Sequence, residues 1–135
     1  MIRALIGGLT ALALLAATPA AAQVAAPRAD DRVVGQAQAP VTLTAYVSTT
    51  CGHCARWHAL EWPLIEETWV RTGKVKVVFR DLFTGPLDAS RNGAVLARCA
   101  PAERFDATLG ALMNSQPTLE QAGGQAAWLR RGVWA

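Results

Sequence analysis

Two cysteines three positions apart, Cys51 and Cys54, lie between a segment that predicts a β-strand and a segment that predicts a helix. Residues 41–48, VTLTAYVS, combine β-branched and aromatic side chains with partial alternation, which is typical of a strand. Thr49 and Thr50 can then cap a helix that begins at or near Cys51. This arrangement places two sulfur atoms where a strand passes into a helix, and it limits both the fold and the chemistry of the chain.

The flanking segments extend this junction into a strand–helix–strand unit over residues 32–85. A short strand is expected at 32–34. The helix after the cysteines should run to about Arg71 with a kink at Pro63, because proline removes a backbone hydrogen bond and crowds the preceding turn. The run KVKVVFRDLF, which starts at Lys74, is rich in apolar residues and suits a buried parallel strand. The crossover between the two parallel strands should be right-handed.

Residues 86–135 have a different pattern, which predicts helices. One helix is expected within 86–100, and a second from Pro101 to Met113. The sequence from Thr118 to Gln121 resembles a capping box and predicts the start of a third helix. The chain is therefore predicted to be an α/β domain whose second part is helical.

The first 22 residues have the parts of a secretory signal peptide. A positively charged start precedes an apolar stretch, Leu5 to Ala17, and an A-x-A pattern predicts cleavage after Ala22. An uncleaved membrane anchor is the alternative, but a spanning helix needs about 20 apolar residues and this stretch ends earlier. We therefore expect an exported chain with no stable membrane anchor, in which residues 23–31 form a mobile leader.

The cysteine count and the charge limit the remaining classes. Three cysteines are too few for a disulfide scaffold, and an odd number leaves one unpaired. Export would place them in an oxidising compartment, where disulfides persist. The formal charge of +3 becomes +2 when Arg3 is removed with the signal, and the lysines and arginines form no stripe. No nucleic-acid partner is predicted.

The position of the two cysteines predicts their chemistry. Unpaired backbone N–H groups and the positive end of the helix dipole favour a thiolate at a helix N-terminus. A protonated His53 adds a positive neighbour, and such settings lower a cysteine pKa by roughly one to five units. Cys51 is therefore predicted to attack and to form the mixed disulfide, while Cys54, one turn later and more buried, resolves it. The predicted catalytic residues are Cys51, Cys54 and His53, the predicted redox-active disulfide is Cys51–Cys54, and the reaction is thiol–disulfide exchange.

Three other roles for the cysteines have less support. Haem attachment needs C-x-x-C-H, but residue 55 is alanine. A zinc site needs four ligands, and the set Cys51, Cys54, His58 and Cys99 would require a cysteine far along the chain. A purely structural disulfide is the plain alternative, although so short a loop restricts the unfolded chain little. No metal or cofactor is predicted.

Other conspicuous residues are expected to be structural. His58 is interpreted as a packing or surface residue. The tryptophans of the same helix, Trp57, Trp62 and Trp69, are expected mainly in the core, and the alternative is an aromatic side chain that faces the substrate. Cys99 is interpreted either as a small core residue or as half of a structural bridge.

Three segments together resemble one known family: APVTLTAYVSTTCGHCARWH, TGKVKVVFRDL and LARCAPAERF. With the signal peptide and the interrupted helix, they resemble the DsbA-type periplasmic thiol oxidoreductases of the thioredoxin fold, from about Arg32 to Met113. The resemblance implies a periplasmic enzyme that donates its disulfide to cysteine-containing exported proteins as they fold. It also implies re-oxidation by a membrane partner, with Cys51 as nucleophile, Cys54 as resolving cysteine and Gly52-His53 as the dipeptide that tunes them.

The sequence departs from the family pattern at three places. The family often has proline where Gly52 stands, and many members carry a buried glutamate where this chain has Ala45. Family members also continue into a cis-proline loop, two strands and a final helix, and none of the seven prolines here fits that loop. The chain is therefore expected to be a truncated member, with a partial thioredoxin-like domain over 32–135 that lacks the C-terminal β-hairpin and helix.

Two functions follow from this interpretation. The first is an exported thiol–disulfide oxidoreductase acting as an oxidase, with reductase and isomerase roles left open because direction depends on the relative stabilities of the two redox states. The second is a binding or chaperone-like remnant with the same fold and little catalysis, which the departure at Ala45 and the missing loop would favour.

Overall fold

The computed structural model describes residues 26–121 and 123–134. The predicted signal peptide, residues 1–22, and the first three residues of the predicted leader lie outside the described residues. Within the described residues, no helix has both the length and the apolar character needed to cross a bilayer.

In the part of the chain that the structure describes, three strands form one mixed sheet in the order β1–β3–β2. They are β1 (Arg32–Val34), β2 (Val41–Val47) and β3 (Val75–Asp81), and they lie where the sequence predicts strands. The central strand β3 pairs parallel with β2 and antiparallel with β1. Its four middle residues, 77–80, are buried, so that both faces of the strand are covered, as expected for a nearly continuous apolar run.

The helix after the cysteines is divided into three pieces. Helix α1 (Gly52–Leu60) is followed by α2 (Trp62–Ile65) and by a π-helical turn (Glu66–Val70). The regular helix is interrupted at Glu61, two residues before Pro63, which is where a proline ring crowds the preceding turn. Gly73, with φ 74°, follows the last turn in the left-handed conformation that favours glycine. The predicted kink and the predicted stop are both present.

The second part of the described chain is helical, but its last helix starts later than predicted. Helix α3 (Leu87–Cys99), a short 3₁₀ helix (Ala102–Arg104) and α4 (Phe105–Asn114) match the expected positions. The capping box expected from Thr118 is wrong, because those residues form a 3₁₀ helix (Gln116–Glu120) and α5 (Gly124–Val133) begins after it. Gly123 and Gly124 both have positive φ, 85° and 39°, so the chain changes direction there before the helix can form.

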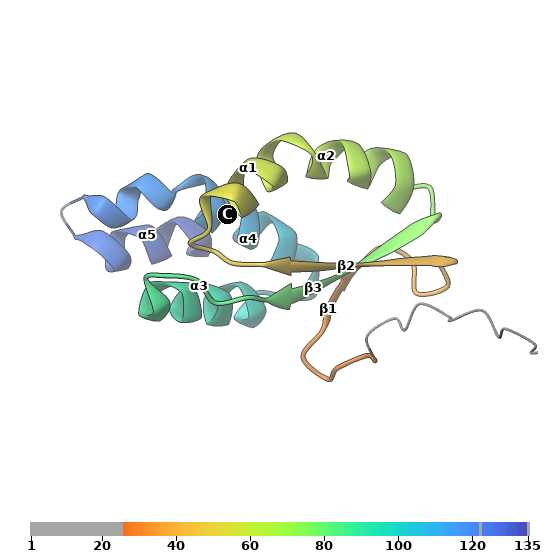
Figure 1. Ribbon diagram of the computed structural model, residues 1–135, viewed down its shortest axis with the longest axis horizontal. Helices are drawn as coiled ribbons and strands as arrows, with labels where there is room; N and C mark the ends of the chain where they lie inside the picture. Colours follow the sequence, from red (N-terminus) through yellow and green to blue (C-terminus); the bar gives the residue numbers. More distant parts are fainter. Residues whose placement is uncertain (1–25, 122, 135) are drawn as a thin grey trace, which may run out of the picture.

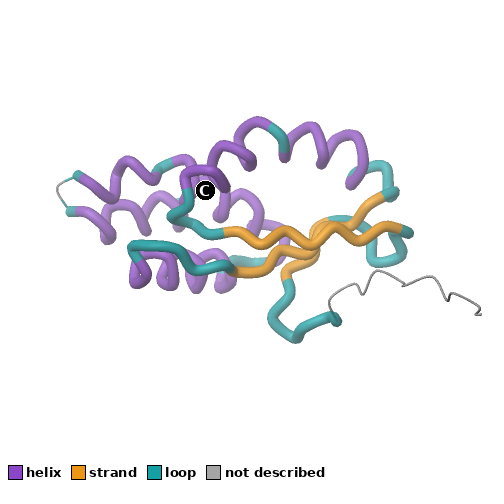
Figure 2. Tube along the Cα trace, in the orientation of Figure 1, coloured by secondary structure: helices purple, strands orange, loops and turns teal. Residues whose placement is uncertain are grey.

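The elements are arranged so that the two parallel strands end beside the helical part (Figure 1). Helices α1 and α2 run over one face of the sheet, and α3 lies on the other side (Figure 1). Helix α4 contacts α1, α3 and α5. The loops that follow β2 and β3 leave the sheet at the same end, next to the start of α1 (Figure 2). The strand–helix junction that carries the cysteines is therefore enclosed by segments distant in sequence.

One hydrophobic core joins the sheet to the helices. Phe79 of β3 makes edge contacts with Trp62 and Phe105, with ring centroids 5.2 and 5.7 Å apart. Further buried members come from α4 and α5: Leu109, Leu112, Met113 and Trp128. Because most of these residues lie on the helical part, that part supplies much of the apolar surface that covers β3.

The tryptophans predicted for the core divide into two groups. Trp62 is buried and Trp57 is half-buried and packs on the core, which agrees with the prediction. The prediction is wrong for Trp69, which is 47% exposed. Trp69 lies in the π-helical turn, whose hydrogen bonds span one residue more than those of an α-helix, and this changes the direction in which its side chain points.

A buried ion pair fixes the beginning of the described chain to β3. Arg80 donates to both carboxylate oxygens of Asp31, at 2.7 and 2.8 Å, and the two side chains are only 3% and 6% exposed. Arg80 also donates to the backbone carbonyl of Ala26, at 2.7 Å. The hydrogen bonds from Arg80 hold the pKa of Asp31 at about 2. Residues 26–31 of the predicted leader thus contact the sheet rather than extend away from it.

Candidate active site

Cys51 and Cys54 lie together at the start of α1. Cys51 is the N-cap residue, with extended backbone angles of φ −87° and ψ 116°, and its sulfur accepts a hydrogen bond from the backbone N–H of Cys54 at 3.4 Å. Both cysteines are free and half-buried. The expectation that a threonine caps this helix is wrong, because the cysteine itself takes that position and Thr50 bonds elsewhere.

The surroundings of the two sulfurs push their pKa values apart. Burial alone would raise the pKa of the Cys51 thiol, but hydrogen bonds from the Cys54 thiol and from the backbone N–H groups of Cys54 and His53 outweigh burial and lower it. Burial raises the pKa of Cys54, and the neighbouring sulfur of Cys51 adds to this increase. As pH rises, the reduced pair therefore loses its first proton from Cys51 and its second from Cys54.

His53 contributes to this site through its backbone. Its N–H is one of the groups that lower the pKa of Cys51, and its exposed side chain lines the pocket described next. The sequence predicted that a positive imidazole would help Cys51. In the structure, the backbone N–H of His53, in the first helical turn, helps to lower the pKa of Cys51. This is the electrostatic effect expected at any helix N-terminus.

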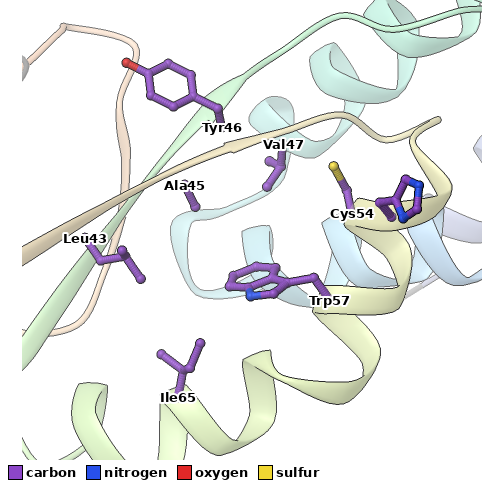
Figure 3. Close-up of a pocket in the computed structure, with 8 residues that line it drawn as sticks. Leu43, Ala45, Tyr46, Val47, Cys54, Trp57 and Ile65 are labelled. Atoms are coloured by element: carbon purple, nitrogen blue, oxygen red, sulfur yellow. The ribbon is translucent and has the colours of Figure 1, made fainter.

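An apolar pocket of about 520 Å³ adjoins Cys54. Figure 3 shows Leu43, Ala45 and Val47 on the side of β2 that faces Trp57 and Ile65, while Tyr46 points away. Ala45, where the resembling family often has glutamate, is therefore part of an apolar wall. No carboxylate side chain lines this pocket among the described residues.

Hydroxyl groups behind the junction form a buried polar cluster that the sequence did not reveal. Ser48 at the end of β2 lies 2.8 Å from the hydroxyl of Thr84 and 3.0 Å from that of Ser90. Thr50 bonds to Thr84, at 3.2 Å, and Thr49 donates to the backbone carbonyl of Ser90. The only sequence signal for this cluster is the accumulation of serine and threonine after two strands that run parallel. These bonds tie the junction to the loop after β3 and to α3.

His58 and Cys99 have the surroundings of non-catalytic residues. His58 is buried and its Nε2 lies 3.1 Å from Oδ1 of Asp106, whose Oδ2 accepts a hydrogen bond from Trp62 at 3.0 Å. This network joins α1 and α2 to α4, which confirms the packing interpretation of His58. The alternative that Cys99 belongs to the core is wrong, because the end of α3 leaves it exposed. Within the described part of the chain, no three histidine, cysteine or acidic side chains gather in a way that could bind a metal.

Comparison with known families agrees with this fold. A family model described as thioredoxin matches residues 28–128, which include the whole sheet, the cysteine pair and most of the helical part. The chain belongs to the thioredoxin family. The predicted thioredoxin-like α/β fold is thereby confirmed.

Individual thioredoxin-family relatives include proteins named for disulfide chemistry. A Rickettsia typhi protein that carries the name of a candidate protein-disulfide oxidoreductase is 33% identical over 70 residues. These residues are 52% of this chain and 25% of that protein. The crystal structure of Wolbachia pipientis alpha-DsbA1 matches with a TM-score of 0.68 and 26% identity, over 80% of this chain and 55% of that one. A protein-disulfide isomerase from Novosphingobium aromaticivorans matches with a TM-score of 0.61 and 25% identity, over 67% of this chain and 45% of that one. The predicted DsbA-type resemblance is confirmed, and the chain spans about half the length of the solved relatives that it matches.

Proposed function

We propose that this chain is a thiol–disulfide oxidoreductase that acts through Cys51 and Cys54. The observation that carries the proposal is the position of Cys51 as N-cap of α1, where backbone N–H groups stabilise its thiolate. A stabilised thiolate is both a good nucleophile in the reduced state and a good leaving group from a disulfide. The relatives named for disulfide chemistry support the same activity.

The proposed direction is oxidation of a substrate dithiol. A substrate thiolate attacks the sulfur of Cys51 in the Cys51–Cys54 disulfide, and Cys54 leaves and takes up a proton, as its raised pKa favours. The second substrate thiolate then attacks the substrate sulfur of the mixed disulfide, and Cys51 leaves as the stabilised thiolate. Two electrons pass from the substrate to the chain, so an electron acceptor must later re-oxidise it.

The pKa shift of Cys51 also favours this direction. A group whose pKa is lower in the folded than in the unfolded state stabilises the fold above its unfolded pKa, and this stabilisation is lost as pH falls through the folded pKa. Only the reduced state has this thiolate, so its stabilisation makes the disulfide more oxidising.

The proposed substrates are unfolded or partly folded exported proteins with cysteines, in the periplasm, and the proposed electron acceptor is a membrane partner.

A binding or chaperone-like role is the second candidate. Among the described strands, β2 is at an edge of the sheet, and its Val41 and Tyr46 are 54% and 48% exposed. An exposed strand edge with apolar side chains can pair with an extended peptide. This role would need neither cysteine.

Disulfide transfer to a reduced, unfolded protein separates the two candidates. The oxidised chain, with no other oxidant present, is expected to form about one substrate disulfide per chain, because each Cys51–Cys54 pair accepts two electrons. Thiol counting and mass spectrometry measure the transfer, and a Cys99→Ser variant excludes the exposed third cysteine. Binding of the unfolded protein without any transfer would refute the proposed oxidase and support the second candidate.

A further inference from the structure

The side chain of Gln116 reaches the cysteine junction from the helical part of the chain. Gln116 starts the 3₁₀ helix after α4, and its Nε2 donates to the backbone carbonyl of Thr49 at 3.0 Å and to that of Cys51 at 3.1 Å. Both neighbours are acceptors only, so the amide must present its NH₂ group to them. The half-buried side chain therefore makes two hydrogen bonds to one turn of backbone.

These two carbonyls lie on either side of Thr50, the last residue before the helix cap. The carbonyl of Cys51 also accepts the first hydrogen bond of α1, from the N–H of Ala55 at 3.0 Å. Thr50, between the two carbonyls, is held by Thr84 through hydroxyl contacts at 3.2 and 3.3 Å. The junction is thus hydrogen-bonded to Gln116 through two of its backbone carbonyls and to Thr84 through the hydroxyl of Thr50.

We propose that Gln116 is a positioning residue for the Cys51 thiolate. By fixing the carbonyls of Thr49 and Cys51, it holds the extended N-cap conformation in which the sulfur receives the N–H of Cys54. Gln116 makes no hydrogen bond to the sulfur and acts through the backbone alone. The inference rests on the proposed function, because it concerns the same nucleophile, and it gives the helical part a role in setting cysteine reactivity.

Replacement of Gln116 by methionine should raise the pKa of Cys51. Methionine keeps the length of the side chain but donates no hydrogen bond, so the turn is free to rotate and the N–H groups lose their alignment with the sulfur. The loss of two hydrogen bonds of ordinary strength, only partly transmitted to the sulfur, predicts an increase of roughly 0.5–1 pKa unit, which is about a three- to tenfold smaller thiolate fraction below the pKa. Gln116→Glu should raise the pKa further, because its carboxylate would face two carbonyls and add negative charge near the thiolate.

The experiment is a pH titration of thiolate absorbance in the reduced chain, carried out in a Cys99→Ser background. Gln121→Met is the matched control, because Gln121 is an exposed glutamine that directly follows the same 3₁₀ helix, and the titration curve of this variant should match that of the parent. Thermal unfolding of the oxidised form, which has no thiolate, shows whether each variant is folded. A purely structural glutamine would lower that unfolding temperature and leave the pKa unchanged.

The outcomes separate this inference from the proposed function. An ordinary cysteine pKa in the parent contradicts the proposed function itself. A lowered pKa in the parent that Gln116→Met leaves unchanged contradicts only the role of Gln116. If Gln116→Met does not fold, Gln116→Asn replaces it, because its amide is too short to reach both carbonyls. An unchanged pKa in Gln116→Asn overturns the inference, and a raised pKa supports it.

Discussion

Replacement of Cys51 by serine is expected to reduce thiol–disulfide exchange to the background rate. A serine hydroxyl stays protonated at neutral pH and cannot form a disulfide, so neither the attack nor the mixed disulfide is possible. Replacement of Cys54 by serine is expected to have a different result. Cys51 keeps its position as N-cap and its backbone N–H donors, so it still attacks, but no second sulfur is present to resolve the product. The Cys54→Ser chain should therefore accumulate as a mixed disulfide.

Mass spectrometry of each variant after incubation with a disulfide-containing peptide distinguishes these results. The Cys99→Ser variant is the control, because Cys99 is exposed at the end of α3, and it should exchange disulfides as the parent does. Accumulation of the mixed disulfide in Cys51→Ser and not in Cys54→Ser would show that the roles of the two cysteines are reversed.

Replacement of Trp62 by alanine is expected to lower the free energy of unfolding by about 3–5 kcal/mol. Trp62 is 2% exposed, packs edge-on against Phe79 and donates its indole N–H to Asp106 at 3.0 Å. The substitution leaves a large cavity beneath α2 and removes one hydrogen bond from a carboxylate that also bonds His58. Both effects weaken the attachment of α1 and α2 to α4.

Urea unfolding of the parent and of the variant measures this loss. Trp69→Ala is the matched control, because Trp69 lies in the same helical segment but is 47% exposed, and it should change the free energy of unfolding by less than about 1 kcal/mol. Equal losses in the two variants would contradict the assignment of Trp62 to the core.

The sequence was sufficient to predict those features of the fold that depend on residues close together in the chain. The three strands and the kink near Pro63 follow from local patterns, because strand alternation and proline geometry act over a few residues. A helix start near Cys51 was also predicted correctly, although the predicted cap was a threonine and the observed cap is Cys51 itself. The α/β class follows from the order of these elements, and the thioredoxin-like fold follows from the resemblance. The signal peptide, the periplasmic location and the partners remain predictions.

The features that were missed depend on contacts between distant residues. Gln116 meets Cys51 from 65 positions away, and Ser48 meets Ser90 from 42 positions away. Nothing in the spacing of a lone glutamine or serine indicates such a partner. The wrong helix start at Thr118 is a different kind of error, because the pair Gly123 and Gly124 adopts positive φ and overrides a weak local capping signal.

The pH dependence of Cys51 alkylation tests the central claim most directly. With iodoacetamide and a Cys99→Ser chain, the alkylation rate should rise with pH and level off once Cys51 is ionised, because only the thiolate reacts. Hydrogen bonds from the Cys54 thiol and from the first helical turn predict that the midpoint is lower in the folded chain than in the same chain unfolded in urea. In the unfolded chain, a free cysteine titrates at about pH 8.5. A midpoint in the folded chain at or above that of the unfolded chain would contradict a stabilised thiolate at the helix start.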